Sequence, residues 1–210
     1  MDSYEITFQT WDKVAKAYQN KFTSVDLYDD TYDIFCELIE KFNPKIFEIG
    51  CGPGNITRYL LSKRPDFEIE AIDKSPTMIR LAKHNNPTGN FKIMDCREID
   101  KMTDRFDAIM CGFCMPYLSK DDCAKLIKDC SFLLNKGGIF YFSTIEGDYK
   151  KSGYETGNNG DKMYVYYHEE DYLQEGLIEN NFKLEDLRRK SYPKSADIVS
   201  THMIFIAAKK

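Results

Sequence analysis

A glycine-rich segment, EIGCGPGN at residues 48–55, contains the residue types that suggest chemistry most directly. Its three glycines, Gly50, Gly52 and Gly54, allow a tight turn and let a ligand approach the backbone closely. The segment lies between a predicted strand and a predicted helix, whose N-terminus presents free N–H groups and a partial positive charge. We therefore expect this segment to bind an anionic group of a ligand.

Two acidic residues end the next two predicted strands. Asp73 lies 19 residues after Gly54, and Asp95 lies 22 residues after Asp73. At the first of these places a carboxylate can accept hydrogen bonds from both hydroxyls of a ribose. At the second, a carboxylate can accept a hydrogen bond from the exocyclic amine of an adenine. Since open α/β sheets bind ligands at the carboxyl ends of their strands, the loop and both acids should surround one ligand.

The loop departs from the dinucleotide-binding fingerprint Gly-x-Gly-x-x-Gly. Counted from Gly50, its third glycine, Gly54, is at the fifth position, and the sixth position is Asn55. Asp95 also has no role in the dinucleotide scheme. An NAD-dependent oxidoreductase is therefore an alternative function for this chain, and Asn55 and Asp95 argue against it.

Alternating strands and helices must position these groups. The spacing of apolar residues predicts helices at about 11–22, 32–42, 55–64, 75–82, 119–134 and 169–180. It predicts strands at about 46–49, 68–72, 91–94, 106–111, 139–144, 163–167, 182–190 and 200–208, with a loop at 146–161. This order indicates an α/β fold with a doubly wound, mostly parallel sheet, helices on both faces and an antiparallel C-terminal hairpin.

The composition is that of a globular protein, with 42% hydrophobic and 30% charged residues in a chain of 210. The net charge of −5 argues against a nucleic-acid partner. No apolar run approaches the roughly 20 residues that span a bilayer, and the N-terminus lacks the apolar stretch of a signal peptide. The seven cysteines are scattered and several lie in apolar runs, which indicates buried thiols in a reducing compartment. We therefore expect a cytoplasmic protein without a membrane partner.

Five segments resemble a known family in their order and spacing. They are EIGCGPGN, AIDKSPTMI (71–79), IMDCREI (93–99), FDAIMCGF (106–113) and LLNKGGIFYFST (133–144). From about residue 11 to residue 144, the chain resembles the class I S-adenosylmethionine-dependent methyltransferases. The resemblance implies a seven-stranded, Rossmann-like sheet whose last strand is inserted antiparallel, with S-adenosyl-L-methionine as cofactor. It implies a single domain over residues 1–210, divided into a helical cap (1–43), a cofactor-binding core (44–144) and a substrate-side loop with the C-terminal hairpin (145–210).

The resemblance also implies roles for the matching residues. Glu48 and the Gly50–Gly54 loop would hold the methionine part of the cofactor, and Asp73 would bind its ribose. Asp95 and Cys96 would bind the adenine. For the three acids, a purely structural place at a strand end or a helix cap is the alternative.

Two further assignments concern the reacting end of the cofactor. The backbone around Cys111 would line the sulfonium, and Tyr18, in WDKVAKAYQNKF (11–22), would cover the cofactor. Core packing is the alternative for Tyr18, because it lies on the apolar face of its helix. The expected cofactor-binding residues are Tyr18, Glu48, Gly50, Cys51, Gly52, Gly54, Asn55, Asp73, Lys74, Met78, Asp95, Cys96 and Cys111.

Methyl transfer by in-line displacement depends mainly on positioning, and it needs a general base only if the nucleophilic atom carries a proton. The catalytic residue is therefore unknown. His168, in YVYYHEEDY, is the candidate, and its alternative is a place at the start of the helix that follows. The segments expected around the acceptor are the N-terminal helices, 113–117 and 146–167, whose many Tyr and Phe residues favour a small-molecule substrate.

The cysteine spacings give only weak evidence for redox chemistry or metal binding. Cys111 and Cys114 have the spacing of a redox dithiol, but they close a predicted buried strand instead of starting a helix. Cys123 and Cys130 lie on the core face of a predicted helix, so we expect no metal site. A cofactor-binding protein that regulates a partner without catalysis is a further alternative, because its binding loop would have the same sequence. The sequence specifies neither the acceptor atom nor an oligomeric state.

Overall fold

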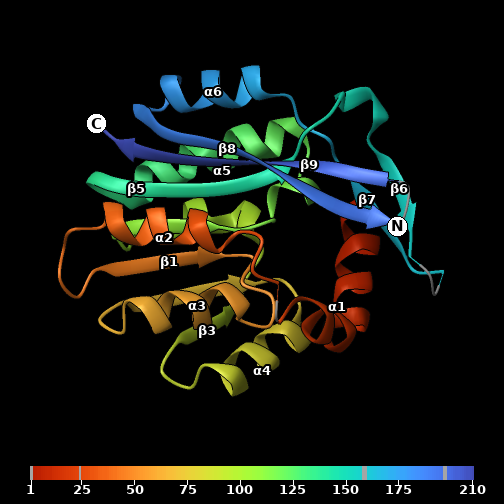
Figure 1. Cartoon of the computed structure of the whole chain (residues 1–210), viewed down its shortest axis with the longest axis horizontal. Helices are drawn as coiled ribbons and strands as arrows, with labels where there is room; N and C mark the ends of the chain where they lie inside the picture. The colour runs from red at the N-terminus through yellow and green to blue at the C-terminus, as the bar shows by residue number, and fades with distance from the viewer. Residues whose placement is uncertain (1, 24, 158–159, 196–197) are drawn as a thin grey trace.

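A seven-stranded sheet is the centre of the computed structural model, which describes residues 2–23, 25–157, 160–195 and 198–210 (Figure 1). The strand order is β3-β2-β1-β4-β5-β9-β8. Strands β1 to β5 pair in parallel, and β9 lies antiparallel between β5 and β8. The predicted fold, a mostly parallel sheet with an inserted antiparallel last strand, is confirmed.

The elements follow the predicted alternation closely. The helices are α1 Ser3–Phe22, α2 Asp29–Leu38, α3 Asn55–Lys63, α4 Pro76–Asn85, α5 Lys120–Leu133 and α6 Glu170–Glu179, with short 3-10 helices η1 Cys96–Lys101, η2 Met115–Tyr117 and η3 Tyr149–Lys151. The strands are β1 Lys45–Ile49, β2 Glu68–Asp73, β3 Asn90–Ile93, β4 Phe106–Cys111, β5 Leu134–Ile145, β6 Gly153–Thr156, β7 Lys162–Val165, β8 Phe182–Ser195 and β9 Ile198–Lys209. None of the described helices has the length and apolar composition needed to cross a bilayer.

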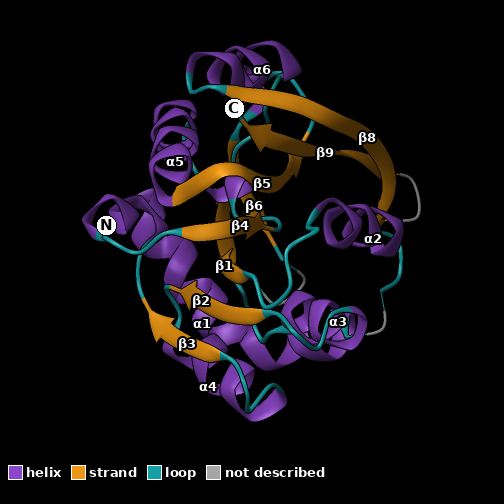
Figure 2. Ribbon diagram, turned by 90° about the vertical axis from the view of Figure 1, so that its left-hand side faces the viewer, coloured by secondary structure: helices purple, strands orange, loops and turns teal. Residues whose placement is uncertain are grey.

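Helices cover both faces of the sheet (Figure 2). On one face, α5 and α6 bury residues such as Leu126 and Leu173, and on the other, α2 and α3 bury Phe35 and Leu60. The strand β4 is buried on both faces, which explains its nearly continuous apolar sequence. The core therefore lies in two layers, one on each side of the parallel strands.

Several boundaries differ from the predictions. Helix α1 begins at Ser3, before the predicted start at residue 11, because Tyr4 and Phe8 continue its apolar face. The predicted loop at 146–161 is wrong in part: it contains η3 and β6, and β6 pairs with β7 in a separate two-stranded sheet. Its residues Asn158 and Asn159 lie outside the described residues.

Helix α1 lies across the edge of the sheet at which the parallel strands end (Figure 1). Hydrogen bonds fix it there at two places. The Thr10 hydroxyl donates to the carbonyl of Lys162 in β7 at 2.6 Å, and the Ser75 hydroxyl, at the start of α4, donates to Asp12 at 2.6 Å. The carboxyl ends of the strands are therefore covered by the N-terminal helix instead of facing open solvent.

Candidate active site

The glycine turn between β1 and α3 has a backbone that requires glycine. Gly50 and Gly54 have φ values of +69° and +80°, in the left-handed region. A Cβ at Gly50 would lie 3.0 Å from Cβ of Cys114, and one at Gly54 would lie 2.3 Å from the side-chain nitrogen of Asn86. The turn is thus packed against two other parts of the edge, which fixes its position.

Asp73 joins this turn to the start of α4. One of its carboxylate oxygens accepts a hydrogen bond from the Gly52 N–H at 2.9 Å, and the other accepts one from the Ser75 N–H at 2.8 Å. Burial raises the pKa of the Asp73 carboxyl above its usual value. Because a carboxylate has about four acceptor sites, two remain for a ligand that carries two hydroxyl groups.

Glu48 lies behind the turn and is 1% exposed. The Thr57 hydroxyl donates to its Oε2 at 2.5 Å, whereas its Oε1 has no partner among the described residues. Burial raises the pKa of the Glu48 carboxyl to about 8. This side chain is therefore mainly protonated at neutral pH.

Asp95 is 5% exposed and paired with a residue that the sequence analysis missed. Nε and Nη2 of Arg97 donate to its two oxygens at 3.0 and 2.6 Å, and the Lys74 ammonium lies 3.7 Å away. Although burial alone would raise it, the Arg97 hydrogen bonds hold the pKa of Asp95 below its usual value. The Arg97 guanidinium also lies 4.1 Å from the ring centroid of Tyr4, so it connects Asp95 to α1.

Two thiols lie beside this ion pair. The Sγ atoms of Cys96 and Cys114 are 3.6 Å apart, and neither forms a disulfide. Their mutual hydrogen bond and burial raise the pKa of the Cys96 thiol well above its usual value. Both side chains therefore act as neutral, apolar wall residues.

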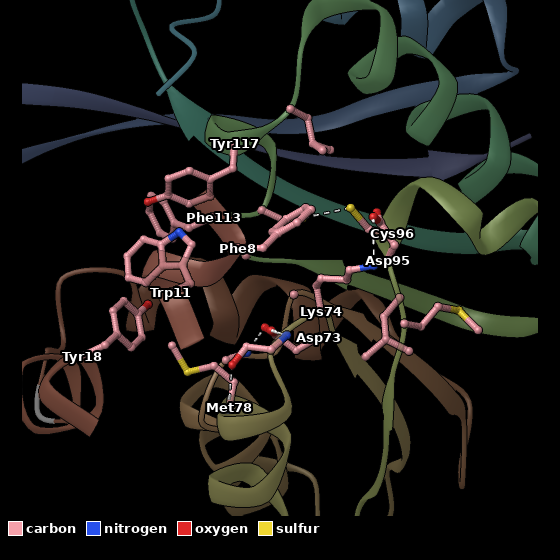
Figure 3. Close-up of a pocket in the computed structure, with 18 residues that line it drawn as sticks. Phe8, Trp11, Tyr18, Asp73, Lys74, Met78, Asp95, Cys96, Phe113 and Tyr117 are labelled. Carbon is pink, nitrogen blue, oxygen red and sulfur yellow. Dashed lines mark hydrogen bonds and ion pairs between the residues drawn. The ribbon is translucent and has the colours of Figure 1, made fainter. Parts of the chain in front are cut away.

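A cavity at this edge brings most of the predicted residues together (Figure 3). Eight of them line it: Tyr18, Gly50, Gly52, Asp73, Lys74, Met78, Asp95 and Cys96. The rings of Trp11, Tyr18 and Tyr117 lie on one side of the cavity, and Asp73 and Asp95 lie on the other (Figure 3). The cavity thus offers apolar surface together with two buried carboxylates.

A second cavity of about 580 Å³ adjoins the first. The two share the lining residues Trp11, Tyr18, Gly50, Gly52, Gly112, Phe113 and Tyr117. Cys51 and Asn55 line the second cavity, whereas Glu48, Gly54 and Cys111 line neither. Two adjoining cavities with a shared wall can hold two ligands side by side.

The second cavity also contains residues that sequence reasoning missed. Strands β8 and β9 contribute Tyr192, Lys194, Ser200 and His202 to its lining. His202 is 6% exposed, its Nδ1 lies 2.7 Å from the Tyr28 hydroxyl oxygen, and burial lowers its pKa to about 4. No local motif indicated these residues, because only the sheet register brings the C-terminal hairpin to the N-terminal helices.

His168 lies elsewhere. It is 0% exposed and lines neither cavity. Its Nε2 lies 3.1 Å from the carbonyl oxygen of Met115, and its Nδ1 bonds the hydroxyl of Tyr172. Burial lowers its pKa to about 4, so this imidazole is neutral and fully engaged with protein atoms.

The chain is similar to known methyltransferases. A family model described as a methyltransferase domain matches residues 46–138. Over 109 residues the chain is 31% identical to malonyl-(acyl-carrier protein) O-methyltransferase of Paenibacillus sp., covering 49% of this chain and 39% of that protein. Over 131 residues it is 28% identical to demethylmenaquinone methyltransferase of Thermotoga maritima, covering 61% of this chain and 56% of that protein. The chain thus spans less than two thirds of the length of these curated relatives.

A solved structure shares the fold over nearly the whole chain. It is the 1,6-didemethyltoxoflavin-N1-methyltransferase of Burkholderia thailandensis, with 1,6-didemethyltoxoflavin and S-adenosylhomocysteine bound, and it superposes with a TM-score of 0.73 at 19% identity. The superposition covers 98% of this chain and 88% of that one. The match of residues 46–138 to the methyltransferase-domain model, together with the shared fold, thus supports a class I S-adenosylmethionine-dependent methyltransferase family for this chain.

Proposed function

We propose that this protein transfers a methyl group from S-adenosyl-L-methionine to a small-molecule acceptor. The observation that carries the proposal is the place of Asp73. It links the glycine turn to α4 and lines a cavity that adjoins a larger aromatic one. A regulatory protein would need the first cavity alone, whereas a transferase needs both.

The residues of the first cavity fit the cofactor. The acceptor sites of Asp73 that remain free suit the two hydroxyls of a ribose. The apolar side chains of Phe8, Met94 and Leu118 line the same cavity near Asp95 and would contact an adenine. The glycine turn and Tyr18 would hold the methionine part, where the two cavities meet.

The chain contributes to the reaction mainly by positioning. When bound, the cofactor supplies an electrophilic methyl group on a positively charged sulfur. Phe113, Tyr117 and Trp11 line both cavities, so they would hold the acceptor's nucleophilic atom in line with that group and exclude water. His168 has no place in this scheme because it lies outside both cavities.

A small acceptor is supported by the second cavity, whose volume of about 580 Å³ is in the usual range for small-molecule sites. The net charge of −5 argues against nucleic acid as substrate. Six of the seven cysteines are buried and all seven are free, which supports a reducing, cytoplasmic location.

Thermal unfolding with S-adenosylmethionine, S-adenosylhomocysteine and NAD, each added separately, tests the proposal. A ligand at a hundred times its Kd should add about 2.7 kcal/mol of stability. We expect the first two ligands to raise the Tm and NAD to leave it unchanged. A shift with NAD alone would support an oxidoreductase and overturn the proposal.

Transfer of a labelled methyl group tests whether the protein is catalytic and whether its acceptor is a small molecule. We expect label to move to compounds in a small-molecule panel but not to bulk RNA or to a protein extract. Binding of both cofactor forms without transfer to any compound would favour the regulatory alternative. Robust transfer to RNA or protein alone would contradict the small-molecule acceptor.

A further inference from the structure

The wall of the second cavity is a nearly continuous series of aromatic rings. Successive ring centroids are 5.2 Å apart from Trp11 to Tyr18 and 4.5 Å apart from Tyr18 to Phe22. The series continues with 6.3 Å from Phe22 to Tyr192 and 5.1 Å from Tyr192 to His202. Such a wall offers faces and edges to a flat, unsaturated ring far better than to a flexible aliphatic chain.

His202, the last ring of this series, is held in one orientation. Its imidazole stacks on Tyr192 with an interplanar angle of 16°, and it lies nearly parallel to the Tyr28 ring, at an angle of 11° with 6.0 Å between the centroids. Phe113 lines both cavities and packs edge-on against the His202 ring, with 4.9 Å between the ring centroids. The Tyr28 hydroxyl engages Nδ1 at 2.7 Å, whereas Nε2 has no protein partner in the part of the chain that the structure describes. The imidazole is thus fixed on one side and free on the other.

The surroundings of His202 keep it neutral. Burial lowers its pKa to about 4, and the nearby Lys194 acts in the same direction. Lys190, its cross-strand neighbour on β8, pairs with Asp30 at 2.6 Å, and Lys194 pairs with Glu155 at 2.5 Å. The Tyr28 hydroxyl also stays neutral, because burial raises its pKa. When Nδ1–H donates to the Tyr28 oxygen, Nε2 therefore has a free lone pair.

We propose that the second cavity takes a planar aromatic or heteroaromatic acceptor bearing an O–H or N–H group, and that Nε2 of His202 binds this hydrogen and accepts the proton during transfer. The inference rests on the proposed function and deepens it. Tyr28 is then a positioning residue, since it fixes the ring through Nδ1. The stacked rings select a flat acceptor, and His202 selects one that can donate a hydrogen bond.

The step balances without a further reactant. A lone pair of the acceptor atom forms the new bond to the methyl carbon, and the bond from that carbon to sulfur breaks with its electron pair on sulfur. The acceptor's proton moves to Nε2, and the imidazolium releases it to solvent afterwards. An O–H or N–H group becomes strongly acidic while its atom is being alkylated, so even a weakly basic imidazole can take the proton.

The test compares aromatic probes with their methylated counterparts in the full chain. Umbelliferone, naphthol and benzimidazole are assayed for transfer and for thermal stabilisation, beside their O- or N-methyl derivatives and beside octylamine and octanoate. We expect transfer to at least one aromatic probe and weaker stabilisation by its methylated form. For the best probe, His202→Gln should lower kcat by about 10²- to 10⁴-fold, the range of general base catalysis, and change KM little. Tyr28→Phe should lower kcat less.

Two controls keep the test decisive. His84→Gln removes an exposed imidazole on α4 and should leave kcat unchanged. S-adenosylhomocysteine should stabilise the wild type and His202→Gln equally, which shows that the variant folds. Transfer to octylamine or octanoate alone, or an unchanged kcat in His202→Gln, would overturn this inference while leaving methyl transfer intact. Absence of any shift with S-adenosylhomocysteine in the wild type would instead overturn the proposed function itself.

Discussion

The carboxylate of Asp73 accepts a hydrogen bond from the Gly52 N–H at 2.9 Å, so the end of β2 is connected directly to the middle of the glycine turn. Its second oxygen is engaged by the Ser75 N–H, at the N-cap of α4. The acid is therefore both part of the scaffold and part of the cavity wall. A substitution at this position should affect stability and ligand binding together.

Asp73→Asn tests this double role, because the amide nitrogen that replaces one oxygen cannot accept from a backbone N–H. We expect a loss of about 1–3 kcal/mol of stability and at least tenfold weaker binding of S-adenosylhomocysteine by titration calorimetry. Asp66→Asn is the control, since Asp66 pairs with Arg64 away from both cavities. It makes the same charge change and should leave the Kd unchanged. An unaltered Kd in Asp73→Asn would remove Asp73 from the binding site.

Glu48 should make the ligand-free protein less stable as pH rises. Its pKa is raised from 4.5 to about 8 in the folded state, so the folded state binds the proton more tightly than the unfolded chain. Stability is then highest below pH 4.5 for this group and falls through about pH 8, by about 1.4 kcal/mol per pH unit. Glu48→Gln, which is neutral at all pH values, should have a flatter profile in urea unfolding.

The two buried histidines affect the pH dependence of stability in the opposite direction to Glu48. They therefore determine the pH range in which the unfolding of the wild type and Glu48→Gln should be compared. The pKa values of His168 and His202 are lowered from 6.5 to about 4, so their contribution to stability is complete above pH 6.5 and is lost as pH falls towards 4. Between pH 6.5 and 8 the slope of stability against pH therefore separates Glu48 from the two histidines, and the difference between the wild type and Glu48→Gln is the contribution of Glu48. Equal slopes for the wild type and Glu48→Gln in this range would contradict the prediction.

Arg97→Ala should loosen the N-terminal helix over the cavity. It removes the two hydrogen bonds to Asp95 and the contact with the Tyr4 ring, and it leaves a buried carboxylate without its main partner. We expect faster amide hydrogen exchange at the start of α1 and about tenfold weaker binding of S-adenosylhomocysteine. Arg105→Ala, at an exposed position, should change neither quantity. Unchanged exchange in Arg97→Ala would show that other contacts hold α1.

His168→Ala should reduce stability without reducing binding. The change removes the hydrogen bond of a fully buried imidazole to the Tyr172 hydroxyl and its contact with the Met115 carbonyl, which keeps the Leu118 N–H as a donor. We expect a loss of about 1–3 kcal/mol. Because His168 lines neither cavity, the Kd for S-adenosylhomocysteine and the turnover of folded protein should stay close to the wild-type values. A large loss of turnover at saturating substrate would restore His168 as a catalytic candidate.

The site residues that could be predicted from the sequence are those that local spacing places at the ends of strands. Gly50 and Asp95 follow β1 and β3, and Asp73 is the last residue of β2. Parallel strands place such residues at one edge of the sheet whatever the details of packing. Arg97 was missed although it is two residues from Asp95, because spacing does not show which surface charge turns inward.

The contribution of the C-terminal hairpin to the second cavity could not be predicted for a different reason. Tyr28 and His202 are 174 residues apart, and their contact depends on the register of β9 against β5 and β8. A one-residue shift in that register would turn His202 to the opposite face of the sheet. The start of α1, in contrast, was available from the sequence, since Tyr4, Phe8 and Trp11 follow helical spacing.

Alanine substitutions at Gly54 and Gly137 can be compared to distinguish the cost of a left-handed backbone from the cost of a steric clash. Both have left-handed φ values, +80° and +76°, so alanine at either position costs about 1–2 kcal/mol through the backbone alone. A Cβ at Gly137 would meet nothing within 4 Å, whereas one at Gly54 would lie 2.3 Å from the Asn86 nitrogen that donates to the Gly54 carbonyl. Gly54→Ala should therefore lose more stability than Gly137→Ala in urea unfolding, and it alone should weaken binding of S-adenosylhomocysteine, because displaced Asn86 no longer holds the turn in place. Equal losses in the two variants would mean that the turn tolerates the displacement, and that its glycine is required for the backbone conformation only.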